Sequence, residues 1–266
     1  MSSPLAFWRR FLARPNEDRI KIFGIAFLVA FTASLVVSTT AIKLKPLQDA
    51  HLAAEREARM QQMLDTLPGL RDLMLETGVD ALETRMVNLV DGQFMAGMDV
   101  DTYDAEATAK DPETSIALDP SIDVAGIKRR ANYVPIYMMQ RDGELMLIVL
   151  PVYGQGFQSS IRAFLALGPD LNTVAALTII SQGETPGLGA RIEDADWQAL
   201  WPGKEIADET GKIMITVMRG QAITPFEVDG ISGATLTGNG ISNMLKFWLG
   251  DSGFGPFLTR LKQEGL

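Results

Sequence analysis

Three glycine-rich segments contain most of the polar groups that could bind a ligand in this chain. They span residues 153–160, 183–189 and 229–240. In the third segment, small residues precede Thr235 and leave its hydroxyl group unobstructed. A helix predicted to begin near Asn239 would point its positive end back at this loop, so a phosphate attached to Thr235 would be stabilised. A helix-capping loop, with Thr237 or Asn239 as the N-cap, fits the composition equally well.

The other two glycine-rich segments give weaker signals. The first lies between a predicted strand and a predicted helix, so its backbone N–H groups could hold a phosphate. It lacks the third glycine of a dinucleotide-binding loop and the lysine of a P-loop. The second holds three glycines and one proline, a rigid turn that a flat ligand can approach closely. Glu184 and Thr185 add polar groups there, although turn formation alone would explain both segments.

The composition excludes several classes of enzyme. The 266 residues include no cysteine and one histidine, His51, which is expected on a solvated helix surface. Thiol nucleophiles, iron–sulfur clusters, cysteine-ligated zinc and multi-histidine metal sites are therefore excluded within this chain. The net charge of -9 without a basic stripe argues against a nucleic-acid partner. The acidic segment 99–123 lacks EF-hand spacing and is predicted to be a solvated loop, so no metal site is expected.

An uncharged apolar segment near the amino terminus predicts a membrane anchor. Residues 22–42 form a run of 21 residues without a charge, which spans about 30 Å as a helix, the thickness of a bilayer core. A cleaved signal peptide is the alternative, but the run is longer than the usual apolar region of one. Five basic residues precede the span and four follow it closely, which favours a cytoplasmic amino terminus.

The pattern of the remaining chain predicts one mixed α+β domain, which must position the three glycine-rich segments. Helix is predicted over 46–78, near 160–166 and over 239–249. Strands are predicted over 133–140, 145–153 and 175–181, with a turn at Asp142 and Gly143 between the first two. The predicted fold class is therefore α+β, with one N-terminal transmembrane helix followed by a mixed α+β domain.

Residues 229–235, DGISGAT, resemble a flavinylation motif, D-x-x-[ST]-G-A-[ST], at every specified position. Three further segments, ETPGLG at 184–189, FWLG at 247–250 and GFGPF at 253–257, resemble the C subunits of the sodium-translocating NADH:quinone oxidoreductases. The first glycine loop departs from that family, because Phe157-Gln158-Ser159 stands where the family usually has Leu-Trp-Ser. The resemblance therefore does not predict a tryptophan contact near the flavin here, and Phe157 is expected to replace it in part.

The resemblance implies a role for each residue of the loops. Thr235 would carry FMN through a phosphoester bond installed by a flavin transferase, with Asp229 helping the transferase recognise the site. No residue of the chain is expected to be catalytic, because the isoalloxazine ring carries the electrons. The residues expected to shape the phosphate turn or line the flavin are Ser232, Gly233, Ala234, Glu184, Thr185, Gly187, Leu188, Gly189 and Ser159.

The resemblance also implies a setting and a division of the chain. The protein would be one of six subunits of a sodium pump in the bacterial inner membrane, in contact with lipid, with its C-terminal domain in the periplasm. The expected segments are a cytoplasmic arm (1–21), the transmembrane helix (22–42), a helical and acidic connecting region (43–130) and the FMN-binding domain (131–266).

Two other functions compete with this one. The G subunit of an Rnf-type ferredoxin:NAD oxidoreductase shares the threonine motif but tends to be shorter between the membrane span and the flavin domain. A membrane-anchored ligand-binding or sensor ectodomain without a redox role would also fit the anchor and the glycine loops.

Overall fold

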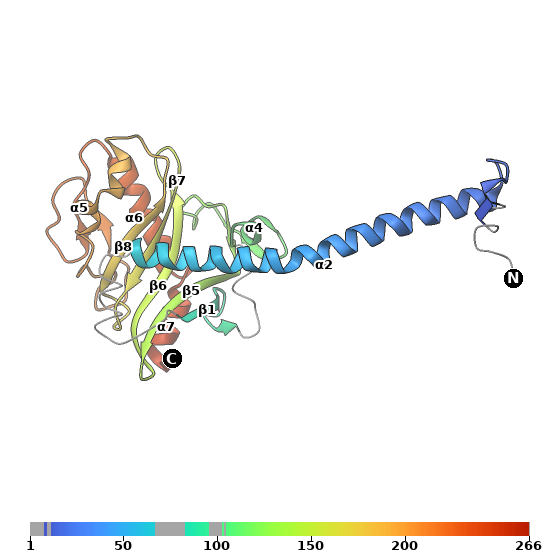
Figure 1. The fold of residues 1–266 in the computed structure, drawn as a ribbon. Helices are drawn as coiled ribbons and strands as arrows, with labels where there is room; N and C mark the ends of the chain where they lie inside the picture. Colours follow the sequence, from blue (N-terminus) through green and yellow to red (C-terminus); the bar gives the residue numbers. More distant parts are fainter. Residues whose placement is uncertain (1–7, 10–11, 67–82, 96–102, 104, 266) are drawn as a thin grey trace. The chain divides into compact units, whose positions relative to one another are not determined.

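The computed structural model describes residues 8–9, 12–66, 83–95, 103 and 105–265. The chain forms two compact units, Met1–Gln61 and Gln62–Leu266, and each is considered by itself. Figure 1 shows the long helix α2 of the first unit and the sheet of the second.

Helix α2 (Arg19–Thr66) contains the predicted membrane segment. Its stretch Arg19–Lys45 is long and apolar enough to cross a membrane, and an 18-residue window within it has a mean hydropathy of 2.3. The described side chains of this stretch are mostly exposed, including Phe23, Phe27 and Val37, as expected of a surface that faces lipid. The helix predicted over 46–78 is confirmed as far as Thr66, while residues 67–78 and the side chain of His51 lie outside the described residues.

A six-stranded antiparallel sheet, in the order β2-β1-β5-β6-β7-β8, is the framework of the second unit (Figure 1). The strands are β1 (Glu83–Asn88), β2 (Phe94–Met95), β5 (Tyr133–Arg141), β6 (Glu144–Gln155), β7 (Ser160–Leu167) and β8 (Val174–Ser181). The turn predicted at Asp142 and Gly143 is confirmed. Both residues have positive φ, as a two-residue hairpin turn of type I′ requires.

Strand β7 corrects the helix predicted near 160–166. Ile161, Ala163 and Leu165 are buried and alternate with more exposed residues, which is the period of two of a strand. The strand pairs with β6 in a register that runs from Ile148 opposite Leu167 to Gln155 opposite Ser160. Residues 156–159 therefore form a hairpin loop. The helical prediction was wrong because a short apolar run does not distinguish a buried strand from a helix.

Helices α6 (Thr235–Leu249) and α7 (Gly255–Glu264) complete the core. Helix α6 packs against β6, and Ile241, Met244 and Trp248 are fully buried in the interface. The helix begins at Thr235, earlier than the predicted start near Asn239. Glycines near the start of the helix made that start hard to predict from the sequence. At Gly240, a Cβ atom would lie 2.7 Å from the Gln155 carbonyl oxygen, so only glycine allows the helix to pack this closely.

The predicted connecting region contributes to the same sheet. Strand β1 comes from within 43–130 and pairs with β5 from 131–266 along its whole length, so the sheet crosses the expected boundary at residue 130. The acidic stretch is not a plain loop where it is described. It contains helix α4 (Ala105–Lys110) and strand β3 (Ser115–Ala117), which pairs with β4 (Arg129–Ala131).

The segment between β8 and α6 is held by small elements. These are the 3-10 helix η2 (Gly189–Glu193), helix α5 (Ala195–Gln198) and the parallel pair β9 (Thr216–Val217) and β10 (Glu227–Val228). They connect the second glycine segment to the third, which leads directly into α6.

Candidate functional site

The three glycine-rich segments meet at one buried carboxylate, that of Glu184. Its Oε1 accepts hydrogen bonds from the backbone N–H groups of Gln158 (2.9 Å) and Ser159 (3.1 Å) and from the Ser159 hydroxyl (3.3 Å). Its Oε2 accepts from Phe157 N (3.2 Å) and from Thr237 Oγ1 (2.6 Å). Glu184 therefore joins the β6–β7 hairpin loop, its own loop and the first turn of α6.

Glycines allow this close approach. A Cβ atom at Gly156 would lie 2.6 Å from Glu184 Oε1. A Cβ atom at Gly189 would lie 2.5 Å from Thr237 Oγ1 and 2.9 Å from Glu184 Cβ. Any side chain at either position would push the carboxylate away from its donors, so these two glycines are required by packing and not only by turn geometry.

The carboxylate of Glu184 is only 4% exposed and is held as an anion. Burial alone would raise its pKa, but the hydrogen bond from Thr237 and those from the backbone of residues 157–159 outweigh burial and lower the pKa below its usual value. These N–H groups are the ones expected to hold a ligand phosphate. In the structure they bind Glu184 instead, so the first glycine segment contains an internal anion.

The amino terminus of α6 is the second feature of the site. Thr235 is the first residue of the helix and is half-buried, and no side chain caps the helix at Ala234. The predicted caps are not used: Thr237 and Asn239 both lie inside the helix. Gly233 turns the chain with a φ of 78°, and Ser232 beside it is exposed. The helix thus presents its positive end next to the Thr235 side chain.

Asp229 fixes the start of this loop. Its Oδ1 accepts a hydrogen bond of 2.6 Å from Ala222 N, and its carbonyl oxygen accepts one of 3.0 Å from Trp197 Nε1. Gly230 follows in contact with the Met218 carbonyl group, where a side chain has no room. Asp229 therefore orders the path of the chain toward Thr235.

Each of the three glycine-rich segments carries an exposed apolar side chain. Phe157, Leu188 and Leu236 are 55%, 44% and 56% exposed. Leu188 lies against the third segment, because a Cβ atom at Gly233 would be 3.0 Å from Leu188 Cδ2. The carbonyl group of Thr185 holds this turn by accepting from Leu188 N and Ala190 N, with Gly187 at positive φ. Exposed apolar groups beside a helix amino terminus suit a ligand with a flat ring and a phosphate.

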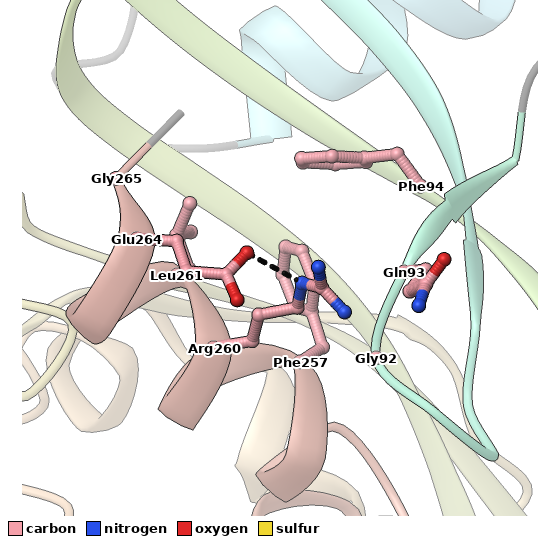
Figure 2. A pocket seen from close by; sticks show the side chains of 8 residues that line it. All are labelled: Gly92, Gln93, Phe94, Phe257, Arg260, Leu261, Glu264 and Gly265. Atoms are coloured by element: carbon pink, nitrogen blue, oxygen red, sulfur yellow. Dashed lines mark ion pairs between the residues drawn. The ribbon is translucent and has the colours of Figure 1, made fainter.

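No cluster of three or more potential metal ligands occurs among the described residues. A pocket of about 320 Å³ lies elsewhere in the same unit, between α7 and the turn after β1. Figure 2 shows its lining, with the Arg260–Glu264 ion pair (2.8 Å) at one side and Phe94 at the other. None of the three glycine segments lines it.

Several known proteins are similar to this chain in sequence. A family model described as an FMN-binding domain matches residues 156–250, which include all three loops in part or whole. The C subunit of the Na⁺-translocating NADH-quinone reductase of Vibrio alginolyticus is 38% identical over 257 residues, covering 96% of this chain and all of the relative. This chain belongs to the family of these C subunits. The Pseudomonas aeruginosa relative is 37% identical and covers 93% of this chain.

Solved structures of this family share the fold. The crystal structure of Shewanella oneidensis NqrC matches 80% of this chain and all of its own with a TM-score of 0.70 and 32% identity. The C subunit from Parabacteroides distasonis matches 77% of this chain and 93% of its own with a TM-score of 0.55 and 26% identity. The predicted fold class, an N-terminal apolar helix with a mixed α+β FMN-binding domain, is confirmed.

Two residues of the site were not predicted from the family motifs. The sequence predicts Thr237 only as a possible helix cap, yet its hydroxyl binds Glu184 from 53 residues away. The sequence predicts no role for Trp197, whose ring N–H binds the Asp229 carbonyl oxygen across 32 residues. Local sequence patterns carry no signal for such pairings, because both depend on how α5 and α6 pack on the loops.

Proposed function

We propose that this chain is the FMN-carrying electron-transfer subunit of a Na⁺-translocating NADH:quinone reductase. Membership of the C-subunit family over nearly the full length and the FMN-binding domain match support this function. The enzyme is an oxidoreductase complex, and this chain contributes a cofactor site to it rather than a catalytic side chain.

We further propose that FMN is attached through a phosphoester bond to the hydroxyl group of Thr235. The observation that carries this proposal is the position of Thr235 at the first turn of α6, a helix without a side-chain cap, at the end of a complete D-x-x-[ST]-G-A-[ST] motif. A phosphate at this point would lie at the positive end of a 15-residue helix.

The neighbouring residues would then contribute a backbone turn and an apolar surface that hold the cofactor. Gly233 and Ala234 form the turn into the helix, and the exposed side chains of Leu188 and Phe157 supply apolar surface for the ring. Bound FMN supplies the electron-transfer chemistry, and the protein fixes its position and electrostatic surroundings. Because the cofactor supplies the chemistry, the protein needs no general base, which suits a chain with one histidine and no cysteine.

The same proposal includes a cellular setting. The basic residues before the apolar helix favour a cytoplasmic amino terminus and a periplasmic domain at the inner membrane, with the helix in lipid. A covalent tether would prevent loss of FMN from an extracytoplasmic domain at any binding affinity. The proposed partners are the other members of a complex of six subunits and, during maturation, a flavin transferase.

Covalent attachment is tested by co-expressing the chain with a flavin transferase and viewing the denatured protein on a gel under ultraviolet light. We expect a fluorescent band that is absent in Thr235→Ala, because the ester oxygen is lost, and that is kept in Thr235→Ser. Thr210→Ala, in an exposed turn of the same unit, is the control and should stay fluorescent. A dark wild-type band in the presence of active transferase would refute covalent attachment.

The Rnf-type alternative is disfavoured by the comparisons, since the match extends over 96% of this chain and all of the Vibrio alginolyticus relative. The complex purified through a tag on this chain should oxidise NADH with quinone in a sodium-stimulated reaction. Ferredoxin-dependent activity in its place would favour the alternative.

A further inference from the structure

Glu184 was expected to line the flavin, but its side chain points away from solvent. It is 4% exposed, and both oxygens are bound to protein donors: three backbone N–H groups, the Ser159 hydroxyl and Thr237 Oγ1. A side chain with this many internal partners has little capacity left for a ligand. Its influence on a cofactor must therefore pass through the groups that it holds.

The groups held by Glu184 belong to the β6–β7 hairpin loop and to the first turn of α6, the turn that begins at Thr235. The 157–159 loop presents the exposed side chain of Phe157, and Thr237 lies in the first turn of α6, two residues after Thr235. Thr237 is itself 2% exposed, so the Thr237–Glu184 hydrogen bond is shielded from water. Buried hydrogen bonds to charged groups are among the strongest in proteins and fix geometry accordingly.

The donors that hold the carboxylate are neutral, so its negative charge is shared with backbone and hydroxyl dipoles and not cancelled by a cation. A charge in a poorly hydrated site acts over several ångströms more strongly than one in water. The carboxylate accepts a hydrogen bond from Thr237, two residues after the proposed attachment point Thr235, so its charge would oppose the addition of electrons to the ring.

We propose that Glu184 is a positioning residue for the flavin, which holds the Phe157 loop against the first turn of α6 and disfavours reduction of the flavin by its charge. This inference rests on the proposed attachment of FMN at Thr235. Two-electron reduction of the flavin consumes two electrons and one or two protons. In an electrochemical titration the electrode supplies the electrons and the buffer supplies the protons.

The test compares two substitutions that remove the same charge. Full-length wild type, Glu184→Gln and Glu193→Gln are co-expressed with the transferase, checked for the fluorescent band and titrated electrochemically. Glu193 is exposed and lies at the end of η2, so it is the solvated control. We expect Glu184→Gln to favour reduction by about tenfold in the equilibrium constant, or about 30 mV for two electrons, and Glu193→Gln to change it less than twofold. Equal potentials in all three proteins would overturn the proposal.

A second pair of variants decides the result if Glu184→Gln does not fold or does not carry flavin. Thr237→Val keeps the shape of the side chain but removes the donor, whereas Thr237→Ser keeps the donor and removes a methyl group. We expect Thr237→Val to change both the potential and the visible circular dichroism of the flavin, and Thr237→Ser to match wild type. Wild-type behaviour of Thr237→Val, or equal changes in both variants, would contradict a role through the hydrogen bond.

These measurements distinguish failure of flavin attachment from failure of the positioning role of Glu184. A dark wild-type band refutes flavin attachment, and with it this inference. A fluorescent wild type whose potential is insensitive to Glu184 and Thr237 leaves attachment at Thr235 intact and refutes the positioning role alone.

Discussion

At the scale of single residues, the site depends on a buried carboxylate whose burial is offset by hydrogen bonds. Removing an ionised group from water is costly, and Glu184 offsets that cost with donors from the β6–β7 hairpin loop and from the first turn of α6. The chain thus uses one of its own side chains where phosphate-binding loops use a ligand. This leaves the amino terminus of α6 as the favourable position for a phosphate, next to Thr235.

The carboxylate should make the domain sensitive to acid. The pKa of Glu184 is lowered in the folded state from an ordinary value of 4.5, so the unfolded chain binds the proton more tightly. Its contribution to stability is present above about pH 4.5 and is lost as pH falls through the folded pKa. Urea unfolding at pH 7 and at pH 4 or below should show a smaller acid loss in Glu184→Gln than in wild type.

That comparison has an internal control. Other acidic groups with lowered pKa values, such as Asp170 and Asp208, remain in every variant and contribute equally to the acid loss. Glu193→Gln should therefore follow wild type across the same pH range. An acid loss in Glu184→Gln as large as that of wild type would mean that the carboxylate does not stabilise the fold.

At the scale of elements, the site is built where β6, β7 and α6 meet. The β6–β7 hairpin supplies the loop that binds Glu184, and α6 lies on β6 through fully buried side chains. Trp248 connects the two directly, because its Nε1 donates a hydrogen bond of 2.7 Å to the carbonyl oxygen of Tyr153. The position of Thr235 therefore depends on how α6 is held against the sheet.

Two tryptophans allow this connection to be measured. Trp248 and Trp201 are both completely buried, but only Trp248 has a partner for its ring N–H among the described atoms. Trp248→Phe should lower the free energy of unfolding by about 1 kcal/mol more than Trp201→Phe, because it removes a hydrogen bond and leaves a carbonyl group unpaired. Urea denaturation of both variants measures the difference. Equal losses would show that ring volume alone matters at the two positions.

At the scale of the whole molecule, the anchor and the domain are separate compact units. The first ends at Gln61, and the second, Gln62–Leu266, contains the sheet, the three glycine segments and Thr235. Tethering a cofactor domain to the membrane raises its effective concentration for partners in the same membrane. In the proposed function, the anchor would favour encounter with the other subunits, while the second unit would hold the flavin.

Removal of the first unit should separate these two roles. A chain of residues 62–266, exported with a cleavable signal and co-expressed with the transferase, is expected in the soluble fraction with its flavin band retained, because the site lies wholly within the second unit. Ultracentrifugation followed by gel fluorescence measures both properties. Full-length protein, expected in the membrane fraction, is the control. A soluble but dark truncated chain would show that attachment needs the anchor.

The amino-acid sequence by itself determined the features that depend on local composition. An uncharged apolar run must avoid water, so residues 22–42 indicated the anchor, and the motif ending at Thr235 and the turn at Gly143 were recognisable for the same local reason. Only the tertiary structure decided that 160–167 is a strand, since its alternating burial depends on neighbours in the sheet. It also decided that Glu184 faces inward, because its donors come from residues 25 to 53 positions away in sequence.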